Sequence, residues 1–156
     1  ITFAKGGYSV IIYHETLKKA SPEMWKVLFY IGSLMQFAND IFDMHKDVPD
    51  GITTLPNRCK DFKALRKKYV ERVRECYKLI YALPFKEQNK KEFCIVMNFI
   101  ISRGVVALDH FISIEKQKGG ALIASELKRK EIICDMQKLS NILRWLKYIY
   151  VLPKFK

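Results

Sequence analysis

Amide and carboxylate side chains between positions 32 and 47 are the residues of this sequence best suited to chemistry. An α-helix turns by about 100° per residue, and on such a helix these polar positions fall within roughly a quarter turn. The stripe consists of Gly32, Gln36, Asn39, Asp40, Asp43 and Asp47. Apolar residues cover most of the remaining circumference, whereas an ordinary surface helix has a broad polar face. The pattern therefore predicts a mostly buried helix whose polar stripe faces a cavity.

Three members of the stripe have the spacing of ligands for a metal ion. Asn39, Asp43 and Asp47 stand at i, i+4 and i+8, so successive side chains lie about 6 Å apart along a helix axis. Carboxylates are costly to bury unless they are paired or bind a metal. Oxygen ligands without His or Cys favour Mg²⁺, or Mn²⁺, over Zn²⁺. The alternative is a solvated acidic face near the C-terminus of a helix, where negative charge is mildly unfavourable.

The same stretch resembles the second metal-binding motif of the class I isoprenoid (terpenoid) synthases. The matching residues are Gln36, Asn39, Asp43, Asp47, Gly51, Leu55 and Pro56. Their spacing is closest to that of the squalene and phytoene synthases. Read instead from Gln36 through Asp40 to Asp43, the helix is similar to the second aspartate-rich motif of the chain-elongating prenyl synthases. The sequence departs from the phytoene synthases at Phe42 and Ile52, where that subgroup usually carries arginine.

The resemblance implies a magnesium-dependent isoprenoid synthase that ionises an allylic prenyl diphosphate for condensation or cyclisation. It implies that Asn39, Asp43 and Asp47 are the catalytic residues that bind the metal. Asp40 is a further candidate ligand, and Asp43 is a ligand position in every alignment.

Three other side chains are candidate contacts of the prenyl diphosphate substrate. Gln36 belongs to the motif, and Lys46 and Arg58 are the basic residues nearest to the acidic row in the sequence. For both basic residues, the alternative is a solvated charge.

The family carries a first aspartate-rich motif on an earlier helix, and no aspartate precedes Gly32 in this sequence. We therefore expect the chain to be the C-terminal part of a larger synthase domain. A missing N-terminal half or a partner chain would complete its site. The competing interpretation is a degenerate synthase or a non-catalytic helical module that binds a partner.

Helical periodicity runs through the whole sequence, and no useful length alternates as a strand would. Helices are predicted over 8–17, 21–46, 60–83, 86–116 and 124–150. Ser21 as N-cap and Pro22 at the first helical position mark the second helix strongly, and Gly6 and Gly7 predict a break before the first. We expect a single all-α domain over 1–156, an antiparallel helical bundle like the C-terminal half of a terpenoid synthase.

The apolar positions of the last three predicted helices define the expected core. Over 60–83 they are Leu65, Tyr69, Val73, Cys76, Tyr77 and Ile80. Over 86–116 they are Phe93, Val96, Met97, Ile100, Ile101, Val105, Leu108 and Ile112. Over 124–150 they are Ile132, Ile133, Met136, Leu139, Leu143, Leu146 and Ile149.

The net charge of +12 arises from 28 Lys and Arg against 16 Asp and Glu. Such an excess suits a nucleic acid, an anionic membrane or a diphosphate substrate. The sequence has no zinc-finger, RNA-recognition or helix-turn-helix signature, so nucleic-acid binding is not expected. The basic cluster between Arg66 and Arg74 predicts a solvated face, with peripheral contact with an anionic membrane as the weaker option.

The cysteines are Cys59, Cys76, Cys94 and Cys134, and no pair has the spacing of metal ligands. The last three lie within helical apolar patterns and are predicted to be reduced core thiols, which points to a cytoplasmic location. No run of 18 apolar residues occurs, so no membrane-spanning helix is predicted.

Overall fold

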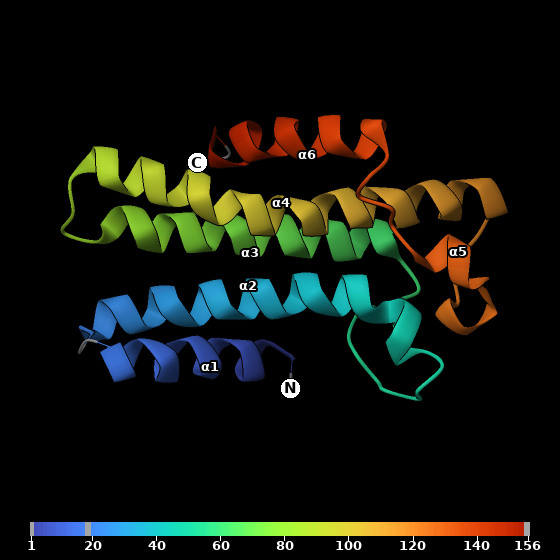
Figure 1. The fold of residues 1–156 in the computed structure, drawn as a ribbon, viewed down its shortest axis with the longest axis horizontal. Coiled ribbons are helices and arrows are strands. Elements are labelled where there is room, and N and C mark those ends of the chain that lie inside the picture. The colour runs from blue at the N-terminus through green and yellow to red at the C-terminus, as the bar shows by residue number, and fades with distance from the viewer. Residues whose placement is uncertain (1, 18–19, 155–156) are drawn as a thin grey trace.

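A computed structural model describes residues 2–17 and 20–154, and this part of the chain is helical without any strand (Figure 1). Its elements are α1 (Thr2–Leu17), α2 (Pro22–Asp47), α3 (Phe62–Ala82), α4 (Glu87–Lys118), η1 (Ala124–Glu126), α5 (Arg129–Ile132), α6 (Leu139–Val151) and η2 (Leu152–Lys154). The all-α prediction is therefore confirmed for the described residues.

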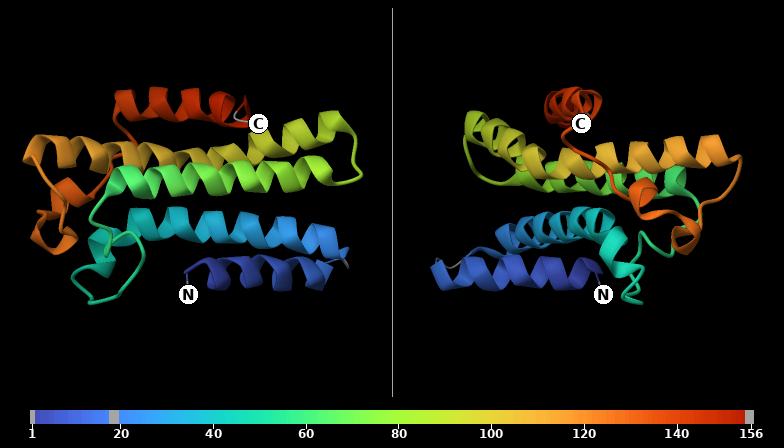
Figure 2. Two further views of the ribbon diagram at one scale, coloured as in Figure 1. Left: turned by 180° about the vertical axis from the view of Figure 1, so that it is seen from behind. Right: turned by 45° about the vertical axis from the view of Figure 1, so that its right-hand side comes forward.

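The long helices lie side by side, and each runs opposite to the one before it in the chain (Figures 1 and 2). The α1 helix packs on α2, α2 packs on α3 and α4, and α6 covers the outer side of α4. The buried apolar residues of α2, α3 and α4 form one continuous core. As a result, α1 and α6 lie on opposite sides of the molecule.

The α2 helix begins and ends close to the predicted positions. The Ser21 hydroxyl accepts a hydrogen bond from the amide of Met24 at 3.3 Å, and Pro22 occupies the first turn. These are the capping features that the sequence indicated. After Asp47 the chain turns through Gly51, whose φ of 68° lies in the region that glycine adopts most readily.

The predicted break at Gly6 and Gly7 is wrong, because α1 runs through both residues without interruption. Both glycines are buried against α2. A Cβ atom at Gly6 would overlap the carbonyl oxygen of Gly32, and one at Gly7 would overlap the ring of Phe29. The glycines therefore allow the backbones of α1 and α2 to approach closely and do not interrupt the helix.

The predicted inward face of α3 is confirmed, since all six of its residues are buried. The prediction for α4 holds for Ile101, Val105 and Leu108, which are buried. It is wrong for Phe93, Val96 and Ile100, whose side chains are 41%, 63% and 37% exposed. The same turns of α4 are buried through Cys94 and Asn98, so the helix faces the core with a different side from the predicted one.

The predicted helix over 124–150 is wrong in its extent, because the structure divides it into η1, α5 and α6. The carboxylate of Asp135 accepts a hydrogen bond from the amide of Gln137 at 2.9 Å. The backbone carbonyl of Asp135 accepts one from the Asn141 side chain at 2.8 Å. Local bonds of this kind compete with helix formation and favour a turn.

Leu139, Leu143 and Leu146 were predicted to point inward, and all three are exposed. Ile133 is exposed as well, whereas the prediction is confirmed for Ile132 and Ile149, which are buried. The residues of α6 that are buried are Asn141 and Ile149. The helix therefore packs on α4 through a different side from the one its leucines predicted.

The cysteines are free of disulfides, and three of them are buried in the core. Burial raises the pKa of the Cys76 thiol to about 12 and that of Cys134 to about 11, so both stay protonated at neutral pH. Among the described helices, only α4 is long and apolar enough to cross a membrane by length and composition, and half of its most apolar window is buried. A buried core helix meets the same criterion.

Candidate functional site

The first half of the polar stripe on α2 lies beneath α1 and does not face an open cavity. Gly32 packs against the backbone of Gly6. At the next residue of α2, the Ser33 hydroxyl donates to the carbonyl oxygen of Phe3 at 2.7 Å. The expected cavity-facing stripe is therefore interrupted here, because the two helices approach too closely to leave space between them.

Asp40 lies at the edge of this contact and is 7% exposed. One carboxylate oxygen accepts from the Thr2 hydroxyl at 2.8 Å, and the other accepts from the Gln36 amide at 2.7 Å. The first turn of α1 also places its positive dipole end near this carboxylate. These partners favour a structural role for Asp40 and Gln36, in which they hold the beginning of α1 on α2.

The second half of the stripe extends beyond the N-terminus of α1. Asn39 is exposed, and Asp43 and Asp47 are half-buried. Asp43 pairs with Lys46 at 3.0 Å, and the two side chains are 45% and 63% exposed. An ion pair with that much exposure contributes little stability, so the Asp43 carboxylate is accessible to other partners.

Asp47 has a pKa raised above that of an ordinary aspartate, first by partial burial and then by the charges of Asp43, Asp40 and Asp50, with Lys46 acting in the opposite direction. Negative charge is therefore concentrated at the C-terminal end of α2. Within the described ranges, no group of three or more His, Cys, Asp or Glu side chains is arranged to hold a metal ion. The candidate row supplies two carboxylates and the amide oxygen of Asn39.

Arg58 lies in the loop that follows α2, where the side chain of Asn57 fixes the backbone. The side-chain oxygen of Asn57 accepts a hydrogen bond from the backbone N–H of Thr54 at 2.9 Å. The side-chain nitrogen of Asn57 donates to the backbone carbonyl of Ile52 at 2.6 Å. Arg58, Thr54 and Thr2 line a cavity of about 470 Å³, and the buried Thr54 hydroxyl has no hydrogen-bond partner among residues 2–17 and 20–154. The structure therefore brings Arg58 to the start of α1, close to the residue that binds Asp40.

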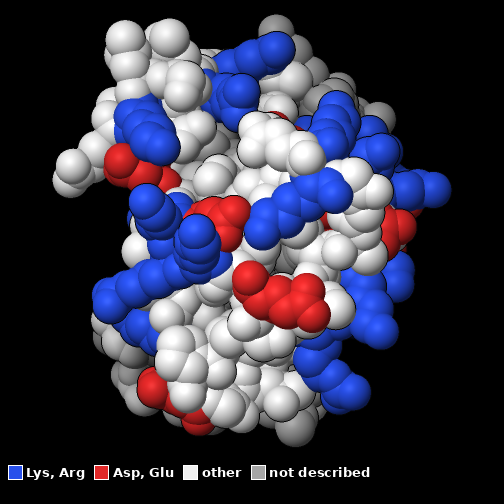
Figure 3. Space-filling model, turned by 90° about the vertical axis from the view of Figure 1, so that its right-hand side faces the viewer, with Lys and Arg blue, Asp and Glu red and all other residues white. Residues whose placement is uncertain are grey.

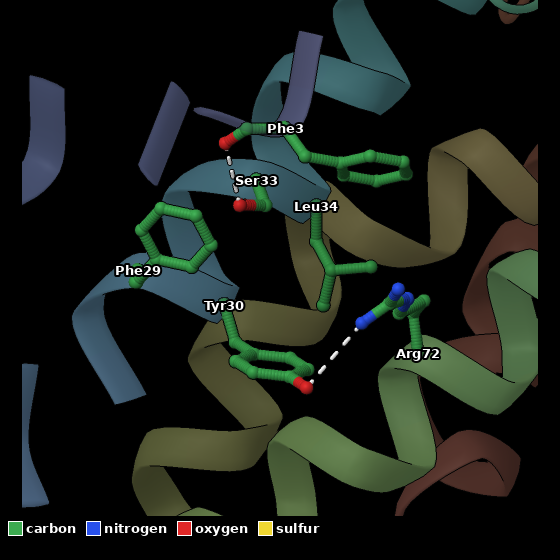
Figure 4. Close-up of a pocket in the computed structure, with 6 residues that line it drawn as sticks. All are labelled: Phe3, Phe29, Tyr30, Ser33, Leu34 and Arg72. Carbon is green, nitrogen blue, oxygen red and sulfur yellow. Dashed lines mark hydrogen bonds between the residues drawn. The ribbon is translucent and has the colours of Figure 1, made fainter. Parts of the chain in front are cut away.

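Two further cavities adjoin this one and share Phe3 as a lining residue. The larger, of about 410 Å³, is bordered by Lys68, Arg72, Glu71 and Glu75. The smaller, of about 100 Å³, is shown in Figure 4.

The sequence placed Arg72 in a solvated basic cluster, and the structure gives it aromatic partners. The guanidinium donates to the Tyr30 hydroxyl at 3.3 Å and lies 5.7 Å from the ring centroids of both Tyr30 and Phe3 (Figure 4). Arginine stacks favourably on aromatic faces. No spacing in the sequence pairs Arg72 with Phe3, because the residues are far apart along the chain.

An apolar pocket of about 300 Å³ lies at the other end of α2. Met24, Val27 and Leu28 form its wall on α2, and His14 contributes a buried Nδ1 atom that has no hydrogen-bond partner in the described part of the chain. Leu28 and Asp43 are fifteen positions apart on α2, a distance of about 22 Å along the axis. The same helix thus carries an acidic end and an apolar end.

Basic side chains are numerous on the face of the molecule that lies on the right in Figure 1. Figure 3 shows the face of the molecule that includes the loop after α2 and α5, where Lys and Arg cover much of the surface and Asp and Glu form small separate groups between them. This distribution agrees with the net charge of +12, and such a surface attracts polyanions.

The fold and site define an all-α bundle with an acidic helix end beside basic residues. No model of a protein family matches the sequence. Comparison with curated proteins gave no match, and comparison with solved structures gave none either.

Proposed function

We propose that this chain forms the C-terminal part of a magnesium-dependent isoprenoid synthase that acts on an allylic prenyl diphosphate. The observation that carries the proposal is the row of Asn39, Asp43 and Asp47 on successive turns at the end of α2. The row lies beyond the cover of α1, and the pKa of Asp47 is raised by burial and by neighbouring carboxylates.

The donor chemistry of the row fits one hard divalent cation. Two carboxylates and an amide oxygen are ligands that Mg²⁺ accepts, and Mn²⁺ accepts the same set. Asp40 is outside this set, because both of its oxygens already accept hydrogen bonds from protein donors. When bound, the cation would neutralise the negative charge that develops on a diphosphate leaving group.

The basic residues near the row have the chemistry to bind a diphosphate. Among the described residues, Lys46 is held only by its exposed pair with Asp43, so its ammonium group can turn toward a phosphate oxygen. Arg58 is exposed and offers the planar donor set that suits phosphate. Both side chains therefore serve to orient the charged end of the substrate.

The apolar end of α2 supports the choice of substrate. Along α2, the partly buried Met35 stands between the acidic end and Leu28, which lines the apolar pocket. An allylic chain needs apolar walls that exclude water from a carbocation. The arrangement of one acidic end and one apolar end on a single helix matches a molecule with a diphosphate head and a hydrocarbon tail.

A thermal-shift experiment with Mg²⁺ and pyrophosphate tests this proposal. The expected result is that the two together raise the melting temperature of the chain, whereas either one alone has little effect. Asp43→Asn should abolish the increase, and the matched control Asp50→Asn should retain it. An increase in the Asp43→Asn protein equal to that of the wild type would refute the assignment.

A second candidate function is that of a non-catalytic helical module that binds a partner. The exposed apolar side chains of Phe93, Val96 and Ile100 on α4 favour it, because a partner helix would cover them. This candidate predicts no response to Mg²⁺ and pyrophosphate in the same experiment.

A further inference from the structure

The α6 helix is fixed on the bundle by polar contacts at several points along its length. The buried side chain of Asn98 donates to the carbonyl oxygen of Ile149 at 2.9 Å. The Tyr148 hydroxyl donates to Asp109 at 2.6 Å, and the Trp145 indole donates to the carbonyl of Phe99 at 3.0 Å. These contacts determine which side of α6 faces the bundle and which side faces outward.

The outward side contains a row of large apolar residues. They are Leu139, Leu143, Leu146 and Tyr150, with exposures of 70%, 58%, 42% and 61%. At 100° per residue, these positions fall within an arc of about 60°. We refer to these four residues as the α6 apolar row. No described part of the chain covers it.

The row is bordered by positive charge. Lys138, Arg144 and Lys147 are exposed, and none of them forms a salt bridge within the described residues. From Lys138 onward the sequence contains no Asp or Glu. Among the longer helices α6 is also the most amphipathic.

We propose that the α6 apolar row is a docking surface for an anionic lipid membrane, with α6 lying in the plane of the interface. A helix with an apolar stripe, Lys and Arg beside it and Trp or Tyr near it binds the boundary between lipid headgroups and acyl chains. Unpaired Lys and Arg near an anionic bilayer add an attraction that depends on the lipid charge. A protein partner with an acidic groove would need carboxylates at matching points, whereas a charged bilayer presents phosphate across its whole surface.

The position of α6 on the outside of the bundle agrees with docking of its apolar row on a membrane. The α6 helix lies on the outside of α4, on the opposite side of the bundle from α1 (Figures 1 and 2). A flat surface can therefore reach the whole length of α6. The surface identified here is not the basic cluster of α3, which the sequence alone indicated for membrane contact.

Co-sedimentation with vesicles tests the proposal. The wild-type chain should bind vesicles of phosphatidylcholine mixed with phosphatidylglycerol, and should bind pure phosphatidylcholine much less. Leu143→Ser with Leu146→Ser should lower the partition coefficient by roughly tenfold or more, because two apolar side chains no longer enter the interface. The matched control is Ile12→Ser with Tyr13→Ser, which changes two side chains of 65% and 70% exposure on α1 and should bind like the wild type.

A second variant separates charge from apolar burial and leaves the apolar row intact. Arg144→Gln with Lys147→Gln should weaken binding to the anionic vesicles by roughly tenfold and have little effect on neutral vesicles. Failure of the wild type to bind anionic vesicles would overturn the proposal. It would also be overturned if the leucine variant bound as the wild type does, or if sedimentation showed a dimer that this variant dissociates, since a second copy would then cover the row.

Discussion

Replacement of Gly32 by alanine should force α1 and α2 apart. A Cβ atom at this position would overlap the carbonyl oxygen of Gly6 and lie 2.8 Å from the Cγ2 atom of Val10. The nearest atom belongs to the backbone, so a change of rotamer cannot relieve the overlap. The helices must separate, and the hydrogen bond from Thr2 to Asp40 lies along the same contact.

The change in the free energy of unfolding on Gly32→Ala is the sum of two opposing effects. Overpacking of a tight contact costs about 1–3 kcal/mol, and a rigid backbone neighbour favours the upper end of that range. Replacement of glycine by alanine inside a helix contributes about 1 kcal/mol in the other direction. The net expectation is a loss of about 1–2 kcal/mol in the free energy of unfolding.

Urea unfolding monitored by circular dichroism measures this loss as a lower midpoint with an unchanged slope. Gly120→Ala is the matched control, because a Cβ atom there meets nothing within 4 Å and the backbone does not have a positive φ. The control should differ from the wild type by less than about 0.5 kcal/mol. If Gly32→Ala were as stable as the wild type, the close contact of α1 with α2 would be wrong.

Three further predictions concern single side chains. Asp47 has a raised pKa in the folded chain, so it binds more protons there than in the unfolded chain. The free energy of unfolding should therefore fall as the pH rises from the ordinary aspartate pKa to the raised value. Asp47→Asn should flatten that part of a plot of melting temperature against pH. Asn98→Ala removes a buried side chain that accepts a hydrogen bond from the Tyr77 hydroxyl and donates one to the Ile149 carbonyl. Urea titration should show a loss of about 2–4 kcal/mol in the free energy of unfolding. A loss below about 0.5 kcal/mol would contradict the role of these bonds. Cys59 is the one cysteine that is not fully buried. A thiol reagent should therefore label Cys59 before the other three, and mass spectrometry of the labelled peptides measures this order. Equal labelling of all four cysteines in the folded chain would contradict the buried positions of the other three.

Much of the fold was predictable from the sequence, because local signals and packing agree there. Ser21 and Pro22 mark the start of α2, and the spacing from Leu65 to Ile80 places one side of α3 in the core. Capping and helical periodicity are properties of neighbouring residues, so a single sequence is enough to recognise them.

Leu139, Leu143 and Leu146 were predicted to point inward, because apolar periodicity alone cannot say which side of a helix has a neighbour. The side that faces α4 is instead selected by contacts that join distant residues, such as Asn98 with Ile149 and Asp109 with Tyr148. The same limit applies to Gly6 and Gly7. A pair of glycines predicts either a break or a close contact, and only the position of Gly32 on the facing helix distinguishes the two.

The candidate site was partly predictable for the same reason. The row of Asn39, Asp43 and Asp47 follows from helical spacing, and α2 is helical through all three positions. The hydrogen bonds of Asp40 with Thr2 and Gln36 could not be predicted, because they depend on where α1 begins relative to α2. Metal binding by the row stays a prediction.

Binding of Mn²⁺ in the presence of pyrophosphate, followed by electron paramagnetic resonance, tests the central claim most directly. Mn²⁺ accepts the same oxygen ligands as Mg²⁺ and is visible by this method when it is free in solution. The wild-type chain should reduce the free-ion signal below the level that pyrophosphate alone produces. Asp43→Asn should lose this further reduction, and Asp50→Asn should keep it. A wild-type chain that leaves the signal unchanged, or an Asp43→Asn chain that binds the ion as well as the wild type, would contradict the assignment of a metal site to α2.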